Sequence, residues 1–312
     1  MVDVSIILVT YNSEWEKIKL TLLSILKQKN ILKQIIIADD GSQKTYVDEI
    51  EELMSFYKFK DYLILNSPIN HGTVLNIANA MKYVKGVYTK TIAPGDYLFN
   101  NTTLYNWVDF MSKNNVSVSF GDAVYYSKTN ELLLYKTKGA PVNKKLFALG
   151  KYNSKQFVDY LLANDTILGA AQLMKSDILI KYLKIIENKV IYAEDYMIRI
   201  MIYDGINVVY YPNIVIWYEY GTGISTSKNS KWDKLLYADF EMSNDLISQR
   251  KADNFMQIKY QKYLKLRKVK NIKKIIKIIC FPSVIVYRMR FKYVKESIPV
   301  GVNKKLFDWI DK

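Results

Sequence analysis

Short runs of β-branched and aliphatic residues alternate with amphipathic stretches over the first hundred residues. The runs that predict strands lie at 4–9, 34–38, 62–65 and 88–92. Between them apolar residues recur at helical spacing, as at Ile18, Leu22 and Ile25 and again over 47–57. Strands that alternate with helices predict an α/β fold, with a mainly parallel sheet of the doubly wound type flanked by helices.

The next part of the chain is less regular. Two apolar runs around Gly121-Asp122 predict a pair of strands, and two further runs separated by Pro212 predict another pair. The four runs are 116–120, 123–126, 208–211 and 214–217. Helical spacing returns over 157–162 and 232–249. No internal repeat interrupts this order.

Polar clusters follow three of the predicted strands. They are Thr10-Tyr11-Asn12, Asp39-Asp40-Gly41-Ser42 and Pro94-Gly95-Asp96. The carboxyl ends of parallel strands meet at one edge of the sheet, where α/β folds bind ligands. Each cluster alone also fits a helix cap or a turn. All three in order predict one shared crevice.

Composition narrows the chemistry of that crevice. Cys280 is the single cysteine and His71 the single histidine of 312 residues, which excludes an intrachain disulfide and a zinc site built from Cys and His. Any metal would need oxygen ligands, and this favours Mg²⁺ or Mn²⁺. A formal net charge of +15 points to an anionic partner.

The motifs at the strand ends resemble a known family. They are 5–12 (SIILVTYN), 36–42 (IIADDGS), 70–72 (NHG) with an asparagine at 79 beyond, 92–97 (IAPGDY) and 192–196 (YAEDY). Together they resemble the family 2 glycosyltransferases over about the first 225 residues. The first two motifs and their spacing are the specific ones.

The resemblance implies a GT-A fold, a nucleoside-diphosphate sugar donor and inversion at the anomeric carbon. The residues that would line the nucleotide pocket are Thr10, Tyr11, Asn12, Asp39, Asp40, Asn70, His71 and Gly72. Asp40, or Asp39, would hydrogen-bond the uracil ring. The 70–72 motif would lie beside the base and the ribose.

The third motif departs from the family pattern. Family members usually carry a run of aspartates where this chain has Ala93-Pro94-Gly95-Asp96. The resemblance places Asp96 near the diphosphate and its metal. One carboxylate could anchor Mn²⁺ or Mg²⁺ if diphosphate oxygens and water complete the coordination shell.

An acceptor hydroxyl must lose a proton while it attacks the sugar, so the reaction needs a general base. Asp195 matches the position of the family's base, with Glu194 as the second choice. Adjacent carboxylates at a helix start point in different directions, so we expect one of them to reach the acceptor. Helix capping is the alternative role for this pair.

Four further residues could contact the donor sugar or the acceptor. They are Asp122, Trp217, Ser225 and Lys228. Asp122 follows a strand and a glycine, and the glycines and hydroxyls of the loop 220–228 could close over phosphates. That loop also fits an ordinary surface loop, and Trp217 fits core packing as well as sugar stacking.

Composition changes near residue 228, which predicts a catalytic domain over 1–228 and a helical, basic, amphipathic extension over 229–312. Basic residues dominate 259–295. Such a segment is typical of an anionic membrane surface, but it also fits nucleic-acid binding, packing on the catalytic domain, or contact between subunits of a homo-oligomer. The sequence predicts no secretion leader and no membrane span.

The sequence therefore predicts an inverting glycosyltransferase, cytoplasmic and peripheral on the inner face of the membrane. It would move a hexose or N-acetylhexosamine from a UDP-sugar to a hydroxyl of a glycan, polysaccharide, lipid-linked or glycoprotein acceptor. A nucleotide- or glycan-binding module without catalysis is the first alternative. A nucleic-acid-binding protein is the second.

Overall fold

The structure is a computed structural model that describes residues 1–127, 130–134, 140–141, 143–150, 160–161, 165–221, 230–266, 279, 299–301 and 309–310. Its strands are β1 (Val4–Thr10), β2 (Lys33–Asp39), β3 (Tyr62–Asn66), β4 (Tyr88–Ile92), β5 (Tyr97–Leu98), β6 (Val118–Ser127), β7 (Asn130–Leu134), β8 (Gln172–Lys175), β9 (Val208–Glu219) and β10 (Pro299–Gly301). Its α-helices are α1 (Trp15–Leu26), α2 (Val47–Phe56), α3 (Thr73–Ala80), α4 (Thr103–Lys113), α6 (Ser176–Ile186), α7 (Met197–Tyr203), α8 (Ser230–Ser248) and α9 (Phe255–Leu266).

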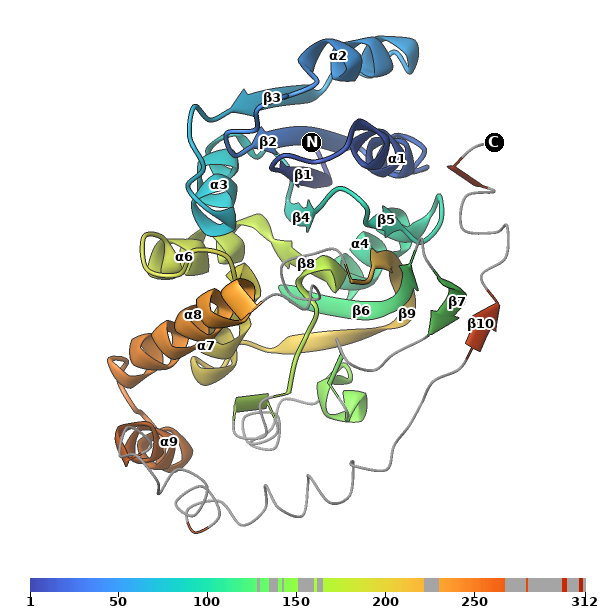
Figure 1. Ribbon diagram of the computed structural model, residues 1–312. Helices are drawn as coiled ribbons and strands as arrows, with labels where there is room; N and C mark the ends of the chain where they lie inside the picture. Colours follow the sequence, from blue (N-terminus) through green and yellow to red (C-terminus); the bar gives the residue numbers. More distant parts are fainter. Residues whose placement is uncertain are drawn as a thin grey trace.

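The described strands form one mixed sheet in the order β10-β7-β6-β8-β4-β1-β2-β3, with β9 paired to β6 and β5 (Figure 1). The four predicted N-terminal strands are present, and β4, β1, β2 and β3 run parallel. Their carboxyl ends therefore meet at one edge. β8 lies antiparallel between β4 and β6, so β6 again runs in the direction of β4.

Two of the sequence predictions need correction. The runs around Gly121-Asp122 form one continuous strand, β6, and the runs around Pro212 form one continuous strand, β9. The two irregular points face each other, because the β6–β9 register jumps from Phe120↔Tyr210 to Asp122↔Ile214. Proline, which lacks an N–H, and glycine are both tolerated at such a bulge.

Helices cover both faces of the sheet. Ile6 and Ile35 turn to one face, which α1, α2 and α4 cover, and Trp107 of α4 is fully buried there. Ile7 and Ile36 turn to the other face, which α3, α6 and α7 cover, joined by residues of α8 and α9. This alternation along β1 and β2 is why both strands are apolar along their whole length.

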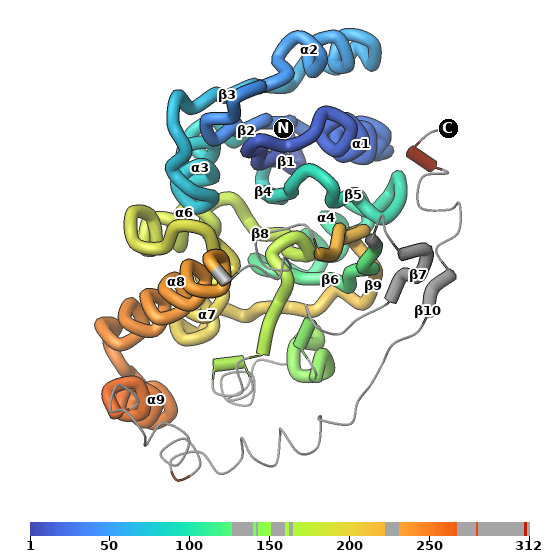
Figure 2. Tube along the Cα trace, in the orientation of Figure 1, coloured from blue at the N-terminus to red at the C-terminus, as the bar shows by residue number. Residues whose placement is uncertain are grey.

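The C-terminal helices continue the second layer. α7, α8 and α9 pack one on the next, as the trace in Figure 2 shows. Tyr260, Tyr263 and Leu264 place the apolar side of α9 in the core, so this part of the basic segment packs on the rest of the chain. Residues 267–278 and 280–298 lie outside the described residues. None of the described helices combines the length and apolar character that crossing a bilayer requires.

Candidate active site

The ends of β1 and β2 are joined through one buried carboxylate. Asp39 accepts hydrogen bonds from the Thr10 hydroxyl (2.8 Å), from the Ser42 backbone N–H (2.7 Å) and from the Ser42 hydroxyl (2.6 Å). The Ser42 hydroxyl oxygen in turn accepts the backbone N–H of Asn12 at 2.7 Å. Tyr11 beside it is half exposed. Asp39 therefore shapes the loop, while Tyr11 and Asn12 are exposed beside it.

Asp40 connects this loop to the start of α3. Its two carboxylate oxygens accept the backbone N–H groups of His71 (2.9 Å) and Gly72 (2.8 Å). The His71 ring lies 3.7 Å from the same carboxylate and 3.1 Å from the Ser67 hydroxyl. The predicted nucleotide residues at 39–40 and 70–72 are thus joined at the carboxyl ends of β2 and β3, where Asn70 and His71 are exposed and Asp39, Asp40 and Gly72 are buried.

Gly72 brings a third segment against these residues. It has φ 91°, and a Cβ built on it would overlap the Ile191 side chain and lie 2.8 Å from the Ile191 carbonyl oxygen. That oxygen accepts the backbone N–H of Val74 at 3.0 Å. Loop 190–193, which leads into Glu194, is therefore packed directly on the start of α3.

Substitution of Gly72 by alanine tests this contact. We expect Gly72→Ala to cost roughly 1–3 kcal/mol of unfolding free energy and to weaken nucleotide binding, because both strain and overlap arise. Gly150 is the matched control, since it has φ 76° and no atom of the described residues lies within 4 Å of an added Cβ. Denaturant unfolding of Gly72→Ala and Gly150→Ala separates backbone strain from the Ile191 overlap. Equal losses would show that the overlap contributes nothing.

A carboxylate from α8 holds the same loop from the other side. Asp239, 4% exposed, accepts the backbone N–H groups of Ile191 (3.0 Å), Tyr192 (2.8 Å) and Ala193 (3.0 Å). Three charge-assisted hydrogen bonds to successive amides fix the loop immediately before Glu194 and Asp195. Sequence reasoning missed Asp239. Its spacing to the buried residues Ser243 and Ile247 marks it as a carboxylate on the inward side of a helix.

Glu194 and Asp195 form a short 3-10 turn (Glu194–Tyr196) in front of α7. Burial raises the pKa of both carboxyl groups. The charge of Asp195 adds to the rise in Glu194, and the charge of Asp239 adds to the rise in Asp195. Gly169 leaves room for the pair, since a Cβ there would lie 3.0 Å from Glu194 Oε1. A carboxylate with a raised pKa is a better proton acceptor near neutral pH.

Asp96, the predicted metal ligand, lies in a tightly held loop after β4. Its Oδ1 accepts the Glu219 N–H at 3.2 Å, and its carbonyl oxygen accepts the Thr21 hydroxyl at 3.0 Å. The Tyr126 hydroxyl donates to the Gly95 carbonyl oxygen. Burial raises the pKa of Asp96 to about 7, a rise that the Glu219 N–H and nearby Lys90 oppose.

The surroundings of Asp96 do not supply a set of metal ligands. The side chain is 6% exposed, and the nearby carboxylate of Glu219 is paired with Lys17 at 2.8 Å. In the described part of the chain no three His, Cys, Asp or Glu residues gather into a group that could hold a metal ion. Mn²⁺ or Mg²⁺ at Asp96 stays a prediction, with donor oxygens and water as the remaining ligands.

The predicted sugar-contacting residues lie elsewhere. Asp122 pairs with Lys144 and accepts the Tyr210 hydroxyl at 2.6 Å. Trp217 is 6% exposed, stacks on Phe99 and donates its indole N–H to the Phe99 carbonyl oxygen. Ser225 and Lys228 lie outside the described residues.

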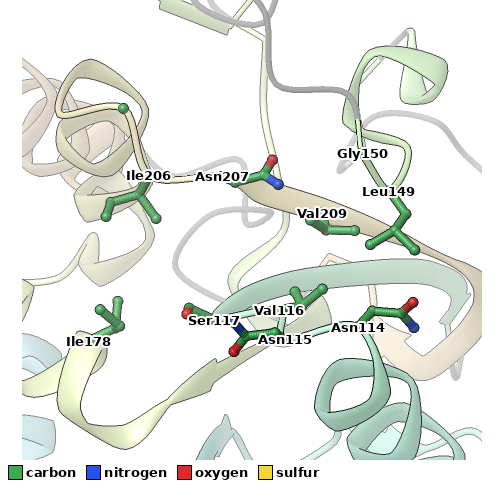
Figure 3. A pocket seen from close by; sticks show the side chains of 11 residues that line it. Asn114, Asn115, Val116, Ser117, Leu149, Gly150, Ile178, Ile206, Asn207 and Val209 are labelled. Atoms are coloured by element: carbon green, nitrogen blue, oxygen red, sulfur yellow. The ribbon is translucent and has the colours of Figure 1, made fainter.

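A cavity of about 470 Å³ opens at the other end of the strands (Figure 3). Its lining comes from the segment before β6, from Leu149, from Ile178 of α6 and from Ile206-Asn207 before β9. These residues precede the amino ends of β6 and β9, whereas the crevice lies at carboxyl ends. None of the predicted site residues that the structure describes lines this cavity.

The family model for glycosyl transferase family 2 matches residues 5–182, more than half of the chain, and so includes the loops that follow β1, β2, β3 and β4. The chain belongs to this family. It is therefore a glycosyltransferase, and its sheet with flanking helices is the GT-A fold. No curated protein sequence matches the chain.

Solved structures of TarS from S. aureus share the fold of this glycosyltransferase. Residues 1–349 of TarS have a TM-score of 0.56 at 16% identity, over 91% of this chain and 80% of that one. The same fragment in complex with UDP-GlcNAc has a TM-score of 0.56 at 14% identity, over the same shares. A longer TarS structure covers 98% of this chain and 50% of its own length at 12% identity.

Proposed function

We propose that this glycosyltransferase transfers a sugar from a UDP-sugar to a hydroxyl of a glycan, polysaccharide or glycoprotein, with inversion at the anomeric carbon. One observation carries the proposal. Loop 190–193 is packed on the Gly72 segment and capped by Asp239, so the predicted nucleotide residues and the pair Glu194-Asp195 belong to one rigid unit. A base and a nucleotide site with fixed relative positions are what a direct displacement requires.

In the proposed reaction the acceptor oxygen attacks the anomeric carbon as its proton passes to the carboxylate of Asp195. The bond between that carbon and the diphosphate oxygen breaks, and its electron pair leaves with UDP. Glu194 is the alternative base. Asp40 and the 70–72 segment would orient the nucleotide, since both lie at the strand ends where α/β folds bind ligands.

The TarS complexes support the choice of donor. TarS has been solved with UDP-GlcNAc and with UDP, and both complexes share the fold of this chain. We therefore propose a UDP-hexose or UDP-N-acetylhexosamine as the donor. The acceptor is proposed only as a sugar or protein hydroxyl, including that of a lipid-linked glycan.

Release of UDP from a panel of donors tests the proposal. UDP-GlcNAc, UDP-GalNAc, UDP-glucose and UDP-galactose would be compared with GDP-mannose, each with Mn²⁺ and with a chelator. We expect release from one UDP-sugar and none from GDP-mannose. A panel in which only a non-uridine donor is consumed would contradict the donor assignment.

The raised pKa of Asp195 predicts how transfer depends on pH. The base works as a carboxylate, so the rate falls as pH drops through the pKa of this group. Burial and the charge of Asp239 raise that pKa above its ordinary value of 3.8, which moves the fall toward neutral pH. Among the described residues, Glu194, Tyr160 and Tyr196 also titrate in the field of Asp195. A kcat profile flat from pH 7 to about pH 5 would contradict this.

We also propose that the enzyme works at the inner face of an anionic membrane. Lys262 and Lys265 are exposed on α9, and each such charge near an anionic leaflet is worth about 1 kcal/mol. Flotation with vesicles that contain phosphatidylglycerol tests this proposal against vesicles of phosphatidylcholine alone. Equal recovery with both would overturn it.

A further inference from the structure

A carboxylate from another element lies against the loop after β4. At Gly95, one of the positions where family members carry aspartates, φ is 98° and there is no side chain. A Cβ built there would overlap Glu219 Oε2 and lie 3.3 Å from the Glu219 carboxyl carbon. The end of β9 therefore places a carboxylate in the space that a side chain at position 95 would need.

The Glu219 carboxylate already forms an ion pair with a lysine. Lys17 of α1 donates from Nζ to Glu219 Oε2 at 2.8 Å. The Lys17 side chain keeps 16% of its surface exposed, against 6% for Glu219, so the ammonium is the more accessible partner. Lys17 lies in the first turn of α1, which follows the carboxyl end of β1, and Glu219 is the last residue of β9.

A second ammonium acts on the same aspartate, Asp96. Lys90 of β4 is fully buried, and within the described residues its hydrogen-bond acceptor is the carbonyl oxygen of Thr91. It is attracted by the carboxylates of Asp96 and Glu194. Burial of a charged lysine costs free energy, because desolvation favours the neutral form. Nearby carboxylates offset that cost.

Two ammonium groups lie among the carboxylates around Asp96. The charges of Lys17 and Lys90 both act on Asp96, and Glu219 and Glu194 are the other carboxylates of this group. The more exposed ammonium, that of Lys17, is the one that the diphosphate of a nucleotide could reach while Glu219 holds it in place.

We propose that Lys17, positioned by Glu219 and backed by Lys90, binds the donor diphosphate and supplies the positive charge that a carboxylate-held divalent ion supplies in other members of the family. This inference rests on the proposed use of a UDP-sugar. An ammonium in contact with phosphate oxygens forms charge-assisted hydrogen bonds and stabilises the leaving diphosphate as the glycosidic bond breaks.

Comparison of UDP and uridine binding tests the inference by titration calorimetry in the presence of a chelator. The full chain would be measured with Lys17→Met, Lys17→Arg and the control Lys19→Met, a lysine on the same helix outside this cluster. We expect Lys17→Met to weaken UDP binding roughly 10- to 100-fold and to leave uridine binding unchanged, since uridine has no phosphate. Lys17→Arg should retain most of the UDP affinity, and Lys19→Met all of it.

The outcomes separate the inference from the function on which it rests. Wild-type protein that binds uridine but needs Mn²⁺ to bind UDP would overturn the lysine assignment and leave the donor assignment intact. Equal loss of UDP and uridine binding in Lys17→Met would mark a structural role and also overturn it. Absence of binding of either ligand to wild type would overturn the proposed donor, and the inference with it.

Discussion

Asp195→Asn is expected to abolish most sugar transfer while UDP binding survives. The amide cannot accept the acceptor proton, and a general base contributes about 10²- to 10⁴-fold to a rate. The substitution keeps the size of the side chain, and the loop before it stays held by Asp239. Steady-state kcat and UDP affinity, measured on the same preparation, give the two quantities.

Glu194→Gln is the comparison that assigns the base. If Asp195 accepts the proton, the loss of kcat in Glu194→Gln stays well below that in Asp195→Asn. The reverse order would transfer the role to Glu194, whose pKa is also raised by burial and by its neighbour. Full activity in both variants would contradict the assignment of any base to this turn.

The regular half of the fold is predictable because its signals are local. β1 and β2 lie between two helical layers, so Ile6, Ile7, Ile35 and Ile36 are all buried, and an unbroken apolar run marks such a strand. The strand at 4–9 was predicted within one residue of Val4–Thr10.

Gly121 and Pro212 show where local signals fail. Each residue weakens a regular strand, so each was interpreted as an end of one. In the structure they face each other across the β6–β9 pair, and the lack of a side chain at Gly121 makes room for Val215 and Asn213. A bulge depends on a partner strand some ninety residues away, which periodicity within one segment cannot reveal.

The site residues also fall into two groups, those that local sequence signals predict and those that they do not. Polar clusters that end strands, such as the one that holds Asp39 and Asp40, could be predicted because the parallel sheet brings strand ends together. The contributions of Glu219 and Asp239 could not be predicted, since each residue lies on a distant element. Asp239 accepts backbone N–H groups, and Glu219 pairs with a single lysine. Neither residue belongs to a recognisable local motif.

Asp239→Asn is expected to lower kcat by roughly 10- to 100-fold, because the asparagine amide group would face backbone N–H groups that now donate to a carboxylate. Asp239 touches no substrate in this proposal and acts by positioning the turn at Glu194-Asp195. Its charge also raises the pKa of Asp195. The acid side of the kcat profile should therefore move to lower pH in the variant. Asp233→Asn, an exposed position on the same helix, is the control.

The shift in the pH profile distinguishes the electrostatic effect of Asp239 on the base from its effect on the stability of the loop. Loss of the three hydrogen bonds alone would lower the unfolding midpoint and scale kcat at every pH, with the acid limb unmoved. Removal of a negative charge next to the base lowers the pKa of Asp195 whether or not the loop moves. A variant that folds, binds UDP and shows an unmoved acid limb would therefore refute the electrostatic link between α8 and the base. A moved limb with reduced kcat would establish that the charge of Asp239 on α8 acts on the base.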